Sequence, residues 1–196
     1  HYIAQIAPVP FSPTFSYAEK ITKYLKDHVS MANLNVYIDD NVSPLYRLHE
    51  DQFKLSETIL DSFKGELECF TIPNNSGDVG AVGWILHHNY LGAIPPKTGI
   101  KGFRVRSGNI QVGDDNLLDE IFTETRFNSW TVAEVHVIDK NIKPNAHSIG
   151  VLNEIDPHHI VAIHENILIP VGTAIIIVAA IKYALVSVLK PTVYIW

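Results

Sequence analysis

The sequence predicts an α+β fold for residues 1–146, followed by an unassigned apolar segment at residues 147–196. Two observations predict the fold class. Short runs with alternating apolar residues are typical of strands, and stretches with the apolar spacing of amphipathic helices lie between these runs. A third observation separates the two parts. Apolar residues accumulate after Ile160, although the hydrophobic content of the whole chain, 46%, is ordinary for a globular protein.

The first elements that we expect are a strand and a helix. Residues 2–7 have the pattern of a strand, which the following prolines end. Apolar side chains at helical spacing predict an amphipathic helix over residues 16–28. Ser16 and Glu19 have the spacing of a capping box, in which both side chains bond free amides at the helix start.

The middle of the chain predicts a hairpin, a second helix and several strands. Residues 35–47 indicate a hairpin around Asp39-Asp40-Asn41, and residues 53–63 indicate a helix closed by Gly65. A short helix is expected to start at Asp114 and Asp115. The further strands are expected at residues 66–72, 79–88, 102–106 and 131–138.

Charge and cysteine content exclude several classes of protein. The net charge of −6 argues against a general nucleic-acid binder. Cys69 is the single cysteine, so an internal disulfide and a cysteine-based zinc site are excluded, and we expect a buried structural thiol. The adjacent His87 and His88 point to opposite faces of a strand, and the later histidines lack metal-ligand spacing. We therefore expect no metal site.

Residues 93–109 are the most informative stretch, because they carry four cations and no acid inside an acidic chain. A loop with lysine, threonine and two glycines can present an ammonium group and backbone N–H groups to a phosphate. The alternative is a solvated hairpin with an exposed cationic face. The four cations are Lys97, Lys101, Arg104 and Arg106.

The apolar segment allows two interpretations. Residues 167–189 contain one charged residue, Lys182, and their length matches the roughly 20 residues that cross a bilayer as a helix. The second interpretation is a buried hairpin formed by residues 160–169 and 174–189. The sequence leaves both open.

Several runs in residues 1–146 resemble a bacterial family of ATPases in the GHKL superfamily, which comprises gyrase, heat-shock chaperone, histidine kinase and MutL. The similarity is to the region that follows the ATP-binding domain. The runs are APVPF at residues 7–11, GWILHHNYLGAIP at 83–95, KGFRVRSGNIQVGD at 101–114, RFNSWTVAEVHVID at 126–139 and KPN at 143–145.

The resemblance implies a β-α-β transducer domain, similar to a domain of a small-subunit ribosomal protein. In this superfamily the nucleotide pocket needs a helix with a catalytic glutamate and a metal-binding asparagine, followed by an Asp-x-Gly-x-Gly loop. None of these is found in this sequence. The chain therefore holds no complete catalytic set. ATP and Mg²⁺ are expected only with an upstream ATPase domain, which would be the partner; homodimerisation stays open.

In relatives of this kind, the transducer supplies a lysine or arginine that reaches the γ-phosphate of the neighbouring ATPase domain. The resemblance implies Lys97 for this contact and Lys101 as the second candidate, whereas Arg104 and Arg106 steer anions or pair with acids. The expected protein is a fragment of a chaperone-like ATP-driven machine. It would couple nucleotide state to conformational change without hydrolysing ATP alone.

Two other functions are kept beside this one: a non-catalytic module anchored in the membrane by residues 167–189, and a small-molecule-binding α+β domain. The chain starts at His1 without a recognisable leader, so we expect a cytoplasmic fragment, with membrane association as the alternative. From His147 onward the sequence departs from the family pattern, which indicates a truncation, a shifted reading frame or a fusion.

Overall fold

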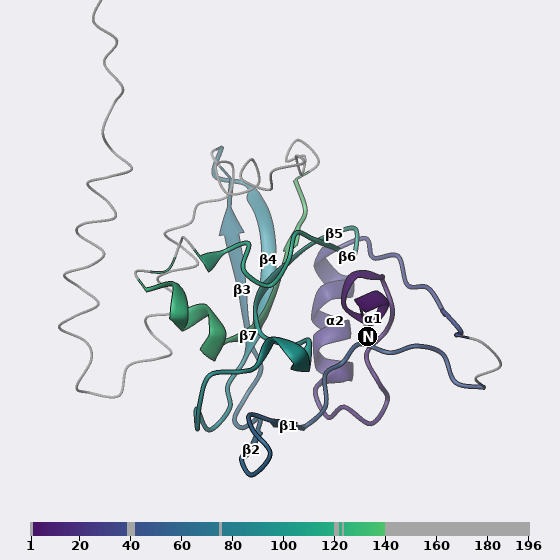
Figure 1. Ribbon diagram of the computed structural model, residues 1–196. Helices are drawn as coiled ribbons and strands as arrows, with labels where there is room; N and C mark the ends of the chain where they lie inside the picture. Colours follow the sequence, from purple (N-terminus) through teal and green to yellow (C-terminus); the bar gives the residue numbers. More distant parts are fainter. Residues whose placement is uncertain (1, 39–41, 75, 120–121, 123, 140–196) are drawn as a thin grey trace, which may run out of the picture.

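The structure, a computed structural model, describes residues 2–38, 42–74, 76–119, 122 and 124–139. It contains helices, a mixed five-stranded sheet and a small antiparallel sheet, which is the predicted α+β class (Figure 1). In chain order the elements are α1 (Tyr2–Ile6), α2 (Ala18–His28), β1 (Gln52–Lys54), β2 (Leu60–Ser62), β3 (Glu68–Pro73), β4 (Val79–Leu86), the 3-10 helix η1 (Pro96–Thr98), β5 (Gly102–Ser107), β6 (Ile110–Val112), the 3-10 helix η3 (Thr125–Trp130) and β7 (Val132–Val137).

The five-stranded sheet has the strand order β3-β4-β7-β5-β6. All neighbouring strands are antiparallel except β5 and β7, which are parallel. Two parallel neighbours cannot be joined by a tight turn, so the chain crosses over between them through residues 108–131, which include β6 and η3. The crossover places β7, the last described strand, at the centre of the sheet.

The two faces of this sheet differ in composition. One side is the apolar face, on which Ile85, Phe103, Ala133 and Val135 pack with one another and with Leu118. The other side is the mixed face, which carries both apolar residues and charged or polar residues. Its apolar residues include Val82, Trp84, Leu86 and Val132, which pack against Phe11, Phe15, Ile21 and Leu25. Its charged and polar strand residues are Arg104, Arg106, Glu134 and His136.

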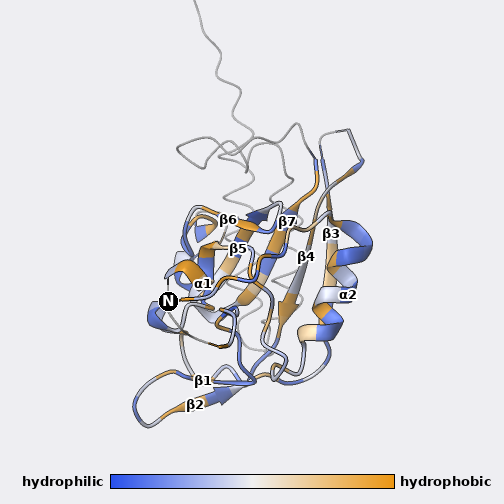
Figure 2. Cartoon of the chain, turned by 90° about the vertical axis from the view of Figure 1, so that its right-hand side faces the viewer, coloured by the Kyte–Doolittle hydropathy of each residue, from blue (hydrophilic) through white to orange (hydrophobic). Residues whose placement is uncertain are grey.

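Helix α2 covers part of the mixed face. Ile21 and Leu25 are buried, whereas the lysines of the helix lie outside, so the helix is amphipathic as predicted. Figure 2 shows hydrophilic residues along α2 and mainly hydrophobic residues along β4 and β7. The expected capping box is wrong, because Ser16 donates its hydroxyl hydrogen to Asp51 and the N-cap residue is Tyr17.

Four predicted strands are confirmed: β3, β4, β5 and β7 overlap the expected ranges. Gly83 in β4 is required by a close approach, since a Cβ there would lie 2.3 Å from the Phe70 ring and 2.7 Å from the Glu134 carbonyl oxygen. The ring of Phe70 therefore packs directly over the β4 backbone.

Two predictions of element type are wrong. Residues 2–6 form a helix rather than a strand, because Ala4 is buried and the Gln5 carbonyl accepts a hydrogen bond from Arg106. Residues 53–63 form β1, a turn and β2 rather than a helix. The Ser56 hydroxyl oxygen accepts hydrogen bonds from two following amides, and this local turn competes with a helix.

The other expected elements are not formed in the described residues. Residues 35–38 and 42–47 contain no strand, although one backbone hydrogen bond of 2.7 Å joins Leu45 to Val36. Residues 115–118 make turns instead of the start of an α-helix. The predictions for residues 147–196, including the segment 167–189, lie outside the described residues. In the described part of the chain no helix is long and apolar enough to cross a membrane.

Candidate functional site

The loop that carries Lys97 is shaped by its neighbours in sequence. Pro96 occupies the first position of η1, where a missing N–H costs no hydrogen bond. The Thr98 hydroxyl donates to the Pro95 carbonyl at 2.8 Å, and Gly99 ends the turn with a φ of 74°. Lys97 is exposed, and no described side chain forms a hydrogen bond or an ion pair with its ammonium group.

Lys97 lies at a cavity of about 660 Å³. The lining combines cations, hydroxyl groups and one acid with an apolar floor, a composition that suits a polar ligand with negative charge. The polar groups at the cavity include Ser12, Thr14, His49, Glu50, Lys54, Lys97 and Thr98, and the apolar groups include Leu48, Phe53 and Ile100. The structure therefore brings the predicted phosphate contact to a cavity that other segments of the chain complete.

The second candidate, Lys101, lies away from this cavity's lining and is buried. Its ammonium group donates to the Asn116 side-chain oxygen at 2.6 Å and lies 3.0 Å from a carboxylate oxygen of Asp115. These contacts satisfy the charge locally and hold the turn after β6 to the start of β5.

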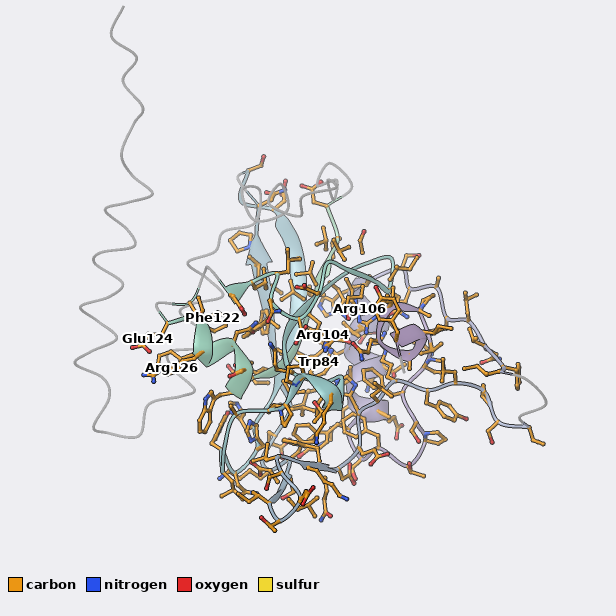
Figure 3. All side chains as sticks on the ribbon, in the orientation of Figure 1. Trp84, Arg104, Arg106, Phe122, Glu124 and Arg126 are labelled. Carbon is orange, nitrogen blue, oxygen red and sulfur yellow. The ribbon has the colours of Figure 1, made fainter. Side chains whose placement is uncertain are left out.

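Arg104 and Arg106 lie side by side on β5 in the interior of the mixed face (Figure 3). The alternation of β5 was predicted correctly, since Phe103 and Val105 point to the apolar face. The alternative interpretation, an exposed cationic face, is wrong for these two arginines, because both are buried and Gln5 accepts a hydrogen bond from each of them.

Glu134 is the centre of a buried ion-pair cluster. One of its carboxylate oxygens accepts from Arg106 Nε at 2.6 Å, and the other accepts from Arg47 Nη1 at 2.5 Å and lies 3.1 Å from His136 Nε2. Arg47 also donates to the Val9 carbonyl and to the side chain of Asn109. The cluster thus ties β5 and β7 to two segments that precede β1.

The protonation states in the cluster follow from burial and charge. Burial alone would raise the pKa of Glu134, but Arg106, Arg47 and His136 outweigh it and hold the pKa well below its ordinary value. Burial lowers the pKa of His136, and it lowers the pKa of His49 to about 3. Glu134 is therefore ionised at neutral pH, whereas both imidazoles are neutral.

A second buried pair, His88 and Asp61, has the geometry of a structural link. His88 Nδ1 lies 2.8 Å from Asp61 Oδ2, and Nε2 lies 3.0 Å from the Trp130 carbonyl oxygen. Asp61 also accepts from the amides of Asn89 and Leu91, and these bonds, with His88, overcome the effect of burial and lower its pKa to about 2. Both ring nitrogens are engaged, so His88 is not placed as a general base.

The remaining candidates from the sequence are the cysteine and the metal-ligating residue types. Cys69 is exposed on the edge strand β3, so the prediction of a buried thiol is wrong. The described residues contain no group of three or more histidine, cysteine, aspartate and glutamate side chains that could hold a metal ion.

Sequence reasoning missed Arg47, His49 and Asn109, which complete the mixed face. Arg47 is 87 residues from Glu134 in the chain, so no local pattern joins them. One signal was available for the strands, because Arg104 and Arg106 alternate in β5 as Glu134 and His136 do in β7. The parallel register pairs Arg104 with Glu134 and Arg106 with His136.

Comparison of the chain with protein families, with curated proteins and with solved structures gave no match. The functional interpretation therefore depends on the geometry of the described residues and on the resemblance in sequence.

Proposed function

We propose that the chain is the transducer region of a GHKL-type ATPase, in which Lys97 contacts a phosphate of a nucleotide held by an upstream domain. The observation that carries the proposal is the different placement of the four candidate cations. Lys101, Arg104 and Arg106 are buried among hydrogen-bond partners, whereas Lys97 is exposed at a polar cavity.

The arrangement of the strands supports the proposal. A β-α-β transducer needs two parallel strands joined by a crossover, and β5 and β7 are parallel neighbours joined in that way. The described part of this crossover holds the strand β6 and the 3-10 helix η3 in place of an α-helix. The structure therefore supports the proposal through the parallel direction and the adjacency of β5 and β7.

The chemical role of Lys97 would be electrostatic. An ammonium group near the transferred phosphoryl group stabilises negative charge that develops on its oxygens. Pro96 fixes the backbone φ directly before Lys97, which reduces the cost of holding the ammonium group in place. The contact would also report to the sheet whether a phosphate is present, because Ile100 and the start of β5 follow directly.

The test is Lys97→Ala in the full-length protein that includes the upstream domain. We expect ATP hydrolysis to fall about tenfold or more while nucleotide binding persists, since the lost contact acts mainly in the transition state. Lys26→Ala is the matched control, because Lys26 is an exposed lysine of α2 outside the lining of this cavity, and the hydrolysis rate of this variant should equal that of the wild type. A hydrolysis rate of Lys97→Ala equal to that of the wild type would end the assignment.

The cavity itself favours a second function, the binding of a small anionic molecule by this chain alone. Its volume is within the range of ordinary ligand pockets. Titration calorimetry of the isolated chain with ATP and ADP separates the two functions. Heat of binding by the wild-type chain that is lost in Lys97→Ala would favour the second function, and the absence of such heat would favour the transducer.

A further inference from the structure

The mixed face contains more positive than negative charge. Three buried guanidinium groups, those of Arg47, Arg104 and Arg106, surround one buried carboxylate, that of Glu134. Arg47 and Arg106 both form ion pairs with Glu134, whereas Arg104 forms no ion pair with any described residue. The acid that acts most strongly on Arg104 is Asp115, which is already paired with Lys101; Glu134 follows, and then Asp114, which is exposed.

Arg104 is also incompletely hydrogen-bonded. The side chain is 2% exposed, and its Nη1 donates to Gln111 Oε1 at 2.8 Å and to Gln5 Oε1 at 3.5 Å. Its Nε atom is buried and has no partner among the described residues. Neutral amides solvate a guanidinium group but supply no counter-charge, and a buried charge without one is strongly unfavourable.

The cover over this arginine is the short helix α1. Gln5 of α1 contacts Arg104 through its side chain and accepts a hydrogen bond from Arg106 Nη2 at 3.0 Å through its carbonyl oxygen. Of the residues of α1, only Ala4 is buried, whereas Tyr2 is 73% and Ile3 is 49% exposed. An isolated helix of five residues is unstable in water, so α1 depends on these few contacts.

Gln5 also connects the arginines to the loop of Lys97. A Cβ added to Gly99 would lie 3.0 Å from Gln5 Nε2, so the amide of Gln5 lies between Gly99 and Arg104. Figure 1 shows α1 beside β5 and β6, on the same side of the five-stranded sheet as α2. A shift of α1 would uncover Arg104 and free Arg106 Nη2, whereas the bonds of Arg106 Nε and Arg47 to Glu134 do not involve α1.

We propose that Arg104 and Arg106 form an anion-binding site that α1 closes, and that its ligand is a doubly charged oxyanion such as a phosphoryl group. The excess of two positive charges matches a dianion, and guanidinium groups bind phosphate oxygens in pairs of hydrogen bonds. Gln5 occupies the place of the anion in the closed state. The proposal depends on the charges of this chain and does not require an upstream domain.

The test compares inorganic phosphate with potassium chloride at the same ionic strength, at pH 8, on the full chain. We expect phosphate to raise the melting temperature and to accelerate amide hydrogen exchange in residues 4–7 about tenfold, because the anion displaces α1. Acetate, which carries one charge, should have a smaller effect. Phosphate also stabilises proteins generally, so a higher melting temperature alone does not show binding at this site. Variants of the site distinguish specific binding from this general effect.

Gln5→Glu places a carboxylate beside Arg104 and should raise the melting temperature while abolishing the phosphate-induced exchange. Arg104→Gln should abolish it as well, and Lys97→Ala should retain it, which separates this site from the cavity of Lys97. Gln5→Glu leaves both arginines in place, so it carries the test even if Arg104→Gln does not fold. Phosphate-induced exchange that persists in Gln5→Glu, or that is absent from the wild type, would overturn the proposal.

Discussion

The two faces of the five-stranded sheet are built from the same strands but are stabilised by different interactions. On the apolar face, Phe103 and Val135 pack with residues of the crossover segment, so stability there depends on volume and buried area. On the mixed face, Glu134 lies among arginines beside a second apolar cluster, so stability there depends on charge as well as on buried area. Neighbouring residues of one strand therefore respond to different perturbations.

The difference has a consequence for assembly of the fold. The apolar face can tolerate changes of side chain of similar volume. The mixed face requires Arg47 and Arg106 to meet Glu134 together, because each arginine left without it would be a buried charge without a counter-charge. The register of β5 against β7 is thus specified by ion pairs on one side and by packing on the other.

The largest expected effect follows from Glu134→Gln. The substitution keeps the shape of the side chain but leaves Arg47 and Arg106 without their shared counter-charge. We expect the free energy of unfolding to fall by about 3–5 kcal/mol, the cost of breaking a buried ion pair from one side. Urea denaturation at pH 7 measures this loss.

Glu66→Gln is the matched control for that loss. Glu66 is paired with Lys20 at 3.4 Å, but its side chain is 91% exposed. Removing an exposed pair is expected to change the free energy of unfolding by less than about 1 kcal/mol. Losses of similar size in the two variants would contradict the distinction between buried and exposed pairs in this protein.

Part of this fold could be predicted from local pattern. The strands β4, β5 and β7 were predicted because alternation and apolar runs are properties of neighbouring residues. Helix α1 could not be predicted from local pattern. Residues 2–6 have a strand-like pattern, and they are helical because of contacts with β5 and β6. The burial of Arg104 and Arg106 was missed for the same reason, because their cover comes from distant segments.

The candidate site shows the same limit. The position of Lys97 in an exposed turn follows from the prolines and glycine around it, and these signals are local. The cavity beside it could not be predicted, since Ser12, Thr14 and Lys54 reach it from two other segments. Local chemistry thus identifies the cation, and tertiary structure supplies its surroundings.

A smaller effect, dependent on pH, is expected from His49→Phe. Burial lowers the pKa of His49 to about 3 in the folded protein, whereas the unfolded chain takes up this proton below pH 6.5. Folding stability is therefore lost as pH falls from 6.5 toward 3, by about 1.4 kcal/mol per pH unit for this group. Phenylalanine keeps an aromatic ring at this place, where His49 contacts the rings of Phe11, Phe15 and Trp84.

The measurement is urea denaturation of wild type and His49→Phe at pH 7.5 and pH 5. Between these two values the wild type should lose about 2 kcal/mol more than the variant. The window lies above the range in which Glu134 takes up its proton, so that carboxylate does not contribute to the difference. An identical pH dependence in both proteins would show that the imidazole of His49 is protonated equally in the folded and unfolded states.

The smallest expected effect concerns the apolar face and sharpens the comparison from the other side. Ile85→Val removes one buried methylene group beside Phe70 and Phe103 and should lower the free energy of unfolding by about 0.5–1.5 kcal/mol. Ile110→Val on β6 is the control. Because Ile110 is half exposed, this substitution should change the free energy of unfolding by less than about 0.5 kcal/mol. Since no titrating group of the mixed face is altered, the loss in Ile85→Val should be equal at pH 7.5 and pH 5. A loss that grows at the lower pH would mean that the two faces of the sheet are energetically coupled through the strands they share.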